Sequence, residues 1–163
     1  MAENHRPVQF LELLRTLTSH DVRFIVVGGV AAVLEGAPIA TFDLDVLYAC
    51  EAGNIARLSA ALESLDAVYV DPAGRRIRPT AERLFGGGHH LLRTRFGRLD
   101  VMGSIGSGQS FEQLLPRSRN HDLHGLTIQV LRLDAIIETK EAAGRPKDRA
   151  VLAMLRELLA AQE

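Results

Sequence analysis

The chain has 163 residues, of which 47% are hydrophobic and 24% are charged, and its formal net charge is −1. These values are ordinary for a globular protein and predict a single domain, residues 1–163, with enough chain to bury a substantial core. They argue against a nucleic-acid binder that relies on overall positive charge, and no apolar run reaches the roughly 18 residues that a membrane span needs.

The first third of the chain predicts helices and strands in alternation. Apolar residues recur at helical spacing from Pro7 to Ser19, which predicts a helix. The β-branched run from Val22 to Val27 predicts a buried strand. Gly28-Gly29 then turns the chain into a short helix, about Val30 to Glu35, and Phe42 to Tyr48 predicts the next strand.

The middle of the chain predicts short elements, with two strands joined at Phe96-Gly97 as a hairpin. The expected elements are a helix at Asn54 to Ser64, a strand at Ala67 to Val70, a helix at Pro79 to Phe85, and strands at His89 to Thr94 and Arg98 to Met102.

A glycine-rich loop follows, and the chain ends in helices. The expected elements are a helix near Ser110 to Leu115, paired strands at His121 to Leu123 and Leu126 to Leu131, and helices at Leu133 to Ala143 and Pro146 to Ala161. The whole pattern predicts an α/β (α+β) fold, in which a mixed sheet flanked by helices (core about 22–131) precedes a helical C-terminus (about 133–161).

The single cysteine, Cys50, excludes an internal disulfide framework. The N-terminal segment also lacks the basic-then-apolar layout of a signal peptide. Together these features predict a cytoplasmic protein.

Arginines are concentrated between residues 75 and 98, where the only acid is Glu82. Two interpretations stay open: a solvated face, or a local patch that binds the phosphates of a nucleotide or of RNA. The arginines are Arg75, Arg76, Arg78, Arg83, Arg93, Arg95 and Arg98.

Two aspartates interrupt the predicted strand Phe42 to Tyr48. Side chains at i and i+2 of a strand share a face, so Asp43 and Asp45 project together while Leu44 points to the opposite face. Two convergent carboxylates repel each other, and a hard divalent cation such as Mg²⁺ relieves that repulsion. Asp100 also interrupts an apolar strand and is the candidate third ligand.

Gly28 and Gly29 directly follow a predicted strand and precede a helix. Glycines at this place let a phosphate approach the backbone, and the start of the next helix offers free N–H groups. A GG pair alone is weak evidence. It is stronger when a helix, a turn and a strand bearing D-x-D follow, as they do here.

These segments resemble the nucleotidyltransferase superfamily, whose members share a G-G or G-S loop, a [DE]-h-[DE] strand and a later strand carboxylate. The chain is most similar to the minimal, AbiEii-like nucleotidyltransferases, some of which act as toxins. Further matches are GSGQSFE at residues 106–112, ETK at 138–140 and GRPKD at 144–148. The resemblance covers residues 22 to about 158.

The resemblance implies metal-assisted transfer of a nucleoside monophosphate from an NTP, such as ATP, to an acceptor. Asp43 and Asp45 would bind Mg²⁺ (or Mn²⁺) that bridges the triphosphate, and Asp100 would help bind the metal and deprotonate or orient the acceptor hydroxyl. Gly28 and Gly29 would hold the β- and γ-phosphates.

The resemblance also implies a set of phosphate-binding side chains outside the aspartates. Lys140 would neutralise phosphate charge, with Arg145 or Lys147 as support, and Thr41 is a further candidate nucleotide contact.

Two positions depart from the family pattern. Ile39 stands where members often carry an arginine, and Val151 stands where they carry an aspartate. The first departure motivates an alternative from another class, a non-catalytic module that keeps the fold and binds a nucleotide or a partner. A third, weaker hypothesis is a metal-dependent phosphoesterase that uses the same carboxylates.

The acceptor and the partners stay open at this stage. An RNA 3′ end, a protein hydroxyl and a small molecule are all compatible with the motifs. The resemblance to toxins raises a cognate antitoxin protein as a partner, and nothing in the sequence fixes the oligomeric state or the base preference.

Overall fold

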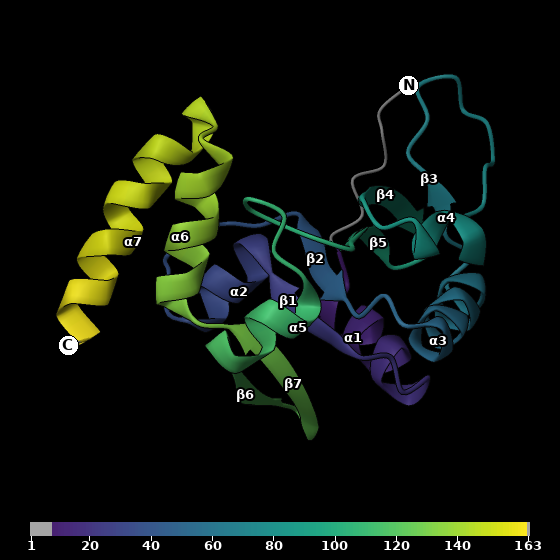
Figure 1. The fold of residues 1–163 in the computed structure, drawn as a ribbon, viewed down its shortest axis with the longest axis horizontal. Coiled ribbons are helices and arrows are strands. Elements are labelled where there is room, and N and C mark those ends of the chain that lie inside the picture. Colours follow the sequence, from purple (N-terminus) through teal and green to yellow (C-terminus); the bar gives the residue numbers. More distant parts are fainter. Residues whose placement is uncertain (1–7, 163) are drawn as a thin grey trace.

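The computed structural model describes residues 8–162 (Figure 1). Within them, seven strands form one mixed sheet in the order β3-β4-β5-β2-β1-β7-β6. The strands are β1 (Phe24–Val27), β2 (Asp43–Tyr48), β3 (Val68–Tyr69), β4 (His89–Thr94), β5 (Gly97–Met102), β6 (Ser118–Leu123) and β7 (Leu126–Leu131).

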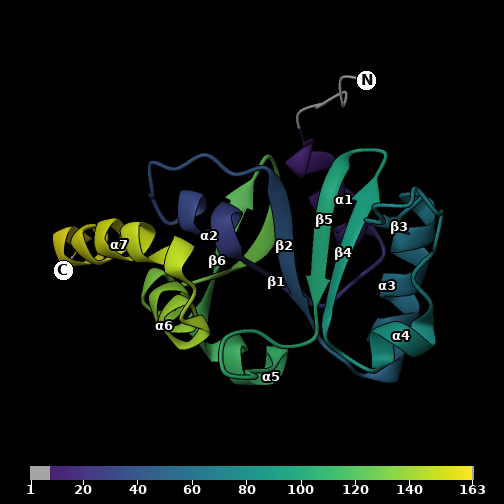
Figure 2. The same cartoon turned by 90° about the horizontal axis from the view of Figure 1, so that it is seen from above.

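Helices flank this sheet, as predicted. They are α1 (Phe10–Ser19), α2 (Gly28–Leu34), α3 (Ala52–Ser64), α4 (Ala81–Phe85), α5 (Phe111–Leu114), α6 (Leu133–Ala143) and α7 (Arg149–Gln162), with 3₁₀ turns η1 (Leu115–Arg117) and η2 (Pro146–Asp148). The two C-terminal helices pack against each other at the end of the molecule away from β3 and β4 (Figures 1 and 2).

The two faces of the sheet differ in what covers them. Leu44, Val46 and Tyr48 of β2 share one face and are fully buried. The Tyr48 hydroxyl donates a hydrogen bond to the Leu84 carbonyl of α4 (2.6 Å), so α4 lies on this face. Asp45 lies on the opposite face, where α2 packs directly against it.

The centre of the sheet combines antiparallel and parallel pairs. β1 and β2 run antiparallel, whereas β2 pairs in parallel with β5 and β1 pairs in parallel with β7. The remaining neighbours are antiparallel, including the predicted β4–β5 hairpin. β2 and β5 therefore lie side by side although about fifty residues separate them in the chain.

Several predicted boundaries were wrong by one or two residues, among them the starts of β1, α3 and α4, and three other differences concern α2, β6 and the last helix. α2 begins at Gly28, two residues before the predicted start, so both glycines belong to the helix. β6 begins at Ser118 instead of His121, because its polar first half pairs with the end of β7 (Ser118 opposite Leu131). The last predicted helix is divided into η2 and α7.

The start of the first predicted helix, Pro7, lies outside the described residues, and α1 begins at Phe10. In the part of the chain that the structure describes, none of the helices has the length and apolar character that a membrane crossing requires.

Candidate active site

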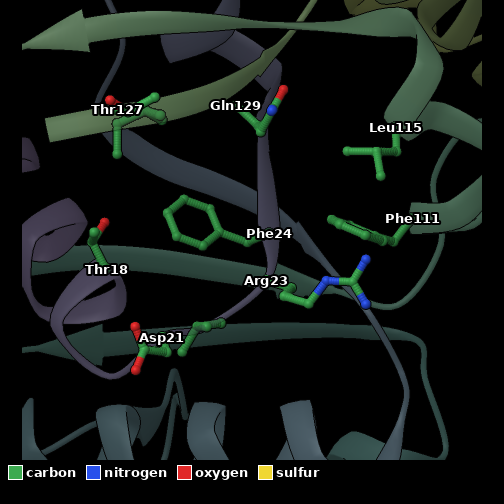
Figure 3. Close-up of a pocket in the computed structure, with 10 residues that line it drawn as sticks. Thr18, Asp21, Arg23, Phe24, Phe111, Leu115, Thr127 and Gln129 are labelled. Atoms are coloured by element: carbon green, nitrogen blue, oxygen red, sulfur yellow. The ribbon is translucent and has the colours of Figure 1, made fainter.

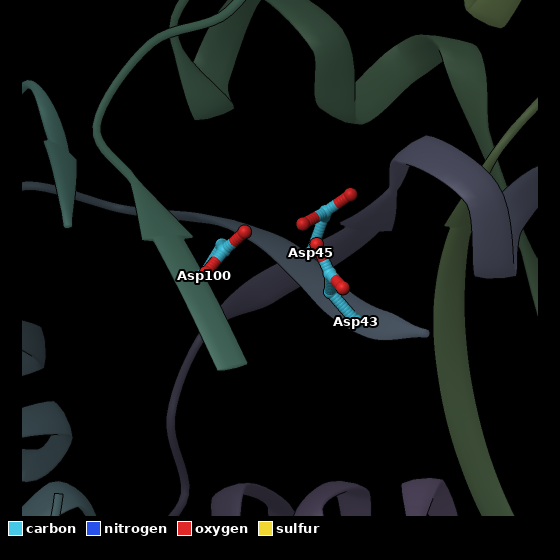
Figure 4. Close-up of side chains that lie close together, drawn as sticks. All are labelled: Asp43, Asp45 and Asp100. Atoms are coloured by element: carbon cyan, nitrogen blue, oxygen red, sulfur yellow. The ribbon is translucent and has the colours of Figure 1, made fainter. Parts of the chain in front are cut away.

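Three aspartates converge at the centre of the sheet. Asp45 lies opposite Asp100 in the parallel β2–β5 register, and Asp43 lies opposite Arg98. One carboxylate oxygen from each of Asp43, Asp45 and Asp100 lies within 4.8 Å of the others, and the side chains point to a common space (Figure 4). The sequence predicted this group, and the strand pairing explains how it forms.

Repulsion and burial disfavour charge on this group. Burial, followed by the nearby carboxylates of Asp100 and Asp43, raises the pKa of Asp45 to about 7. Burial also raises the pKa of Asp100, although the Arg98 guanidinium, 3.1 Å from Asp100 Oδ1, opposes that shift. Without a cation the site therefore keeps a proton that ordinary aspartates release.

The donor set fits a hard divalent cation. All three ligands are carboxylates, which Mg²⁺ and Mn²⁺ prefer over softer donors, and three carboxylates leave coordination positions for water and phosphate. Among the described residues, no other trio of His, Cys, Asp or Glu converges as closely. A divalent cation would remove the repulsion that raises the pKa of Asp45.

The two predicted glycines lie against the aspartate group. A Cβ atom on Gly28, whose φ is +65°, would lie 2.2 Å from Asp45 Oδ2, and a Cβ on Gly29 would lie 2.6 Å from Thr41 Oγ1. The Thr41 hydroxyl in turn donates to the Asp43 carbonyl (3.2 Å). The structure thus brings Gly28, Gly29 and Thr41 together with the aspartates because β1, α2 and the start of β2 meet there.

The predicted cations lie at the junction of α6 and α7. Lys140 is in the last turn of α6, and its charge lowers the pKa of Asp45, so it acts on the aspartate group. Its ammonium lies 3.4 Å from Asp148 Oδ1, and Arg145 Nε lies 2.9 Å from Asp148 Oδ2. Lys147 is exposed on η2.

Asp148 was not predicted as a site residue. It is only 5% exposed, and the charges of Lys140 and Arg145 outweigh its burial, so its pKa lies below the usual range. The GRPKD match was the one signal in the sequence that could have identified it.

The predicted arginine patch is largely paired. Arg75 pairs with Asp71, Arg76 and Arg78 both pair with Asp66, and Arg98 pairs with Asp100. Arg83 lies over the ring of Tyr69 and Arg95 over that of Phe96, while Arg93 also has an interaction partner. Because all three of these acids lie outside residues 75–98, counting charges within that window did not reveal the pairs. The pairing favours a structural role for most of these arginines.

In the part of the chain that the structure describes, β4 has exposed side chains on the sheet face that carries the aspartates. His89, Leu91 and Arg93 of β4 face Met102, Asp100 and Arg98 of β5, and all three β4 residues are exposed. Leu91, directly opposite Asp100, is 48% exposed. The aspartate group therefore lies between α2, which packs against Asp45, and the exposed side chains of β4.

A separate hollow lies at the other end of β1. It has a volume of about 380 Å³ and is lined by residues that include Arg23, Phe24, Phe111 and Gln129 (Figure 3). The Arg23 guanidinium lies over the Phe111 ring, 5.1 Å from its centroid. None of the predicted site residues lines this hollow.

The comparisons with known proteins place the fold. No match was found among protein-family models or among curated proteins. Among solved structures, the chain is similar to TM1012 from Thermotoga maritima, described as a candidate nucleotidyltransferase. The identity is 17% and the TM-score 0.59, over 98% of this chain and 99% of that one.

Two structures of ANT(2'')-Ia are similar as well. The complex with adenylyl-2''-tobramycin matches at 13% identity and a TM-score of 0.57, over 94% of this chain and 87% of that one. The solution structure of this antibiotic-resistance factor matches at 14% identity and a TM-score of 0.58, over 94% and 82% of the two chains. At these identities the likeness is one of fold, so the chain has the predicted nucleotidyltransferase fold, and the narrower AbiEii-like assignment stays a prediction.

Proposed function

We propose that this protein is a Mg²⁺-dependent nucleotidyltransferase that transfers a nucleoside monophosphate from an NTP to an acceptor hydroxyl. The observation that carries the proposal is the convergence of Asp43, Asp45 and Asp100 on a nucleotidyltransferase fold. A cluster of three carboxylates, of which Asp100 is buried and the other two are partly buried, is costly unless a cation compensates it, and such a cluster suits a metal-dependent transferase.

The residues have separate roles in this reaction. Asp43, Asp45 and Asp100 would hold the divalent cation, which when bound neutralises phosphate charge and favours in-line displacement. The acceptor oxygen forms a bond to the α-phosphorus as the bond to the pyrophosphate oxygen breaks, and pyrophosphate leaves with the electron pair. Asp100 orients the acceptor hydroxyl and accepts its proton.

Side chains around the aspartates would bind the triphosphate. Gly28 and Gly29 leave room beside Asp45 and Thr41 because neither has a Cβ. Lys140 supplies positive charge on the same side, with Arg145 and Lys147 at the adjoining turn. These assignments rest on proximity and charge.

The acceptor would approach Asp100 over β4. Leu91 is exposed directly opposite Asp100, whereas Asp100 itself is only 6% exposed, so the acceptor would have to displace side chains that cover this carboxylate. An RNA 3′ end, a protein hydroxyl and a small molecule are the candidate acceptors. The resemblance to AbiEii-like proteins supports two finer parts of the proposal, a toxin–antitoxin role with a cognate antitoxin and a cytoplasmic setting.

Thermal unfolding with each of ATP, GTP, CTP and UTP, with and without Mg²⁺, tests the proposal. A ligand at about 100 times its Kd stabilises the native state by ~2.7 kcal/mol, a readily measured shift. We expect such a shift for at least one nucleotide only with Mg²⁺, and its loss in Asp43→Asn. Asp122→Asn, an exposed carboxylate of β6, is the control and should behave as wild type.

Product analysis then separates the reaction types. Pyrophosphate together with a nucleotide adduct indicates transfer, whereas nucleotide cleaved in water alone indicates a phosphoesterase. No Mg²⁺-dependent shift with any of the four nucleotides would overturn the proposal.

A non-catalytic binding module is the second candidate, and Ile39 is the observation that favours it. Ile39 is partly buried against the hydrophobic core, so this position offers no cation to a triphosphate. This alternative predicts nucleotide or partner binding without pyrophosphate release on any acceptor.

A further inference from the structure

The joint between α6 and α7 contains a buried carboxylate that binds two cations at once. Asp148 is 5% exposed, and each of its oxygens has a different partner: Oδ1 lies 3.4 Å from Lys140 Nζ and Oδ2 lies 2.9 Å from Arg145 Nε. Gly144, in the left-handed conformation (φ +63°), ends α6 and allows the chain to reverse. The reversal carries Asp148 back to the side chain of Lys140, eight residues earlier in the chain.

Simple attachment of α7 to α6 does not account for this arrangement. Burying charges costs free energy, and apolar residues of similar size join helices at least as well. α7 already packs against α6 and buries Leu152 and Leu155 in the hydrophobic core, and an exposed ion pair between Arg156 and Glu141 (2.7 Å) spans the same two helices. The buried carboxylate therefore needs another explanation.

The orientation of Lys140 offers an explanation for the buried carboxylate of Asp148. The Lys140 side chain is only 17% exposed, so most of it is enclosed by the protein. Its helix, α6, packs against α2, whose Gly28 lies beside Asp45, and the Lys140 charge acts on Asp45. A lysine side chain that is free to move loses rotamer entropy each time it binds a phosphate. A fixed counter-ion that holds the ammonium in place reduces that loss before the nucleotide arrives.

We propose that Asp148 is a positioning residue that holds the Lys140 ammonium toward the nucleotide site, with Arg145 balancing the carboxylate charge. This inference rests on the proposed nucleotidyltransferase function and deepens it. Asp148 would act through Lys140 and would not touch the nucleotide. With both cations retained, the three-residue group keeps a net positive charge toward the triphosphate.

If only the number of charges mattered, removing the Asp148 carboxylate would strengthen nucleotide binding, because Lys140 and Arg145 would lose their counter-ion. The positioning role predicts weaker binding instead, so the direction of the change in Kd distinguishes the two.

The test measures the Kd of each Mg²⁺–NTP (ATP, GTP, CTP and UTP) by calorimetry for wild type and matched variants. Asp148→Asn removes the charge with little change of shape, and Asp148→Glu keeps the charge. Glu141→Gln is the control, because it breaks the exposed ion pair across the same helices and leaves Lys140 untouched. Lys140→Met, alone and with Asp148→Asn, shows whether Asp148 acts through Lys140.

We expect Asp148→Asn to raise the Kd about tenfold, Asp148→Glu to restore most of the affinity, and Glu141→Gln to leave it unchanged. In the Lys140→Met background, Asp148→Asn should have no further effect on the Kd. If Asp148→Asn does not fold, the Kd of Asp148→Glu still tests the positioning role. The Kd values of Lys140→Met and Glu141→Gln are then compared with each other. Equal Kd values for Lys140→Met and Glu141→Gln would then refute the role.

The outcomes separate this inference from the proposed function. Unchanged or tighter binding by Asp148→Asn, while wild type binds Mg²⁺–NTP, overturns the positioning role and leaves the transferase proposal standing. Additive effects of Asp148→Asn and Lys140→Met on the Kd would overturn the positioning role in the same way. Failure of wild type to bind any of the four nucleotides overturns both.

Discussion

Replacing Asp45 with asparagine should make the metal-free protein more stable while removing its response to Mg²⁺. Burial and the neighbouring carboxylates of Asp100 and Asp43 raise the pKa of Asp45 from its ordinary value of 3.8 to about 7. The folded state therefore holds a proton that the unfolded state has already released, so stability falls as pH rises between those two values.

The magnitude follows from the two pKa values. Each pH unit between them lowers the free energy of unfolding by about 1.4 kcal/mol, so the wild type should lose about 3 kcal/mol from about pH 5 to about pH 7. Below pH 3.8 both states are protonated and this contribution vanishes. Above about pH 7 the loss is complete and constant. Asparagine does not ionise, so the variant lacks this contribution at every pH.

Urea denaturation in EDTA across this pH range measures the effect. The difference between wild type and Asp45→Asn reports the titration of Asp45 together with its effect on Asp100, because the titrating groups away from this pair are common to both proteins. Near pH 8 the loss is complete, so the variant should be the more stable by about 4 kcal/mol, which is about 1.4 kcal/mol for each pH unit between 3.8 and about 7. Saturating Mg²⁺ should stabilise the wild type alone. Equal pH dependence of the two proteins in EDTA, or a less stable variant near pH 8, would refute the reasoning.

Two further substitutions test the geometry around Asp45. Gly28→Ala should cost about 1–3 kcal/mol and weaken Mg²⁺ binding, since its Cβ would lie 2.2 Å from Asp45 Oδ2. Gly74→Ala is the control in thermal unfolding, because Gly74 also has a positive φ (+71°) but no atom close to the position of its Cβ. Similar losses of stability in both variants would rule out the clash with Asp45. Arg98→Met should move the pH midpoint of Mg²⁺ binding upward, because Arg98 opposes the raised pKa of Asp100. Titration calorimetry at a series of pH values measures this midpoint. A midpoint equal to that of the wild type would show that the Arg98–Asp100 pair does not affect Mg²⁺ binding.

The aspartate group could be predicted because its chemistry is visible locally. Asp43 and Asp45 interrupt an apolar strand at a spacing that places both on one face, and Asp100 interrupts another. In the structure Asp45 and Asp100 lie opposite each other in the parallel pair, with Asp43 beside them. The mixed sheet flanked by helices is confirmed.

What the sequence could not supply depends on contacts between distant segments. The polar first half of β6 has little strand propensity and becomes a strand because β7 pairs with it. Asp148 looks like an ordinary helix-start residue until the reversal at Gly144 places it against Lys140. The arginines between residues 75 and 98 looked unpaired because Asp66 and Asp71 precede that window.

The parallel pairing of β2 with β5 has a consequence for how this chain tolerates change. Because Asp45 and Asp100 meet through backbone pairing, a one-residue shift of β5 along β2 would turn Asp100 to the opposite, apolar face. Such a shift would bury a charge among Leu44 and Val46 and disperse the aspartates at once. Insertions or deletions that shift this pairing would thus destabilise the fold and separate the three aspartates. Length changes in the exposed 71–79 loop would leave the three carboxylates where they are.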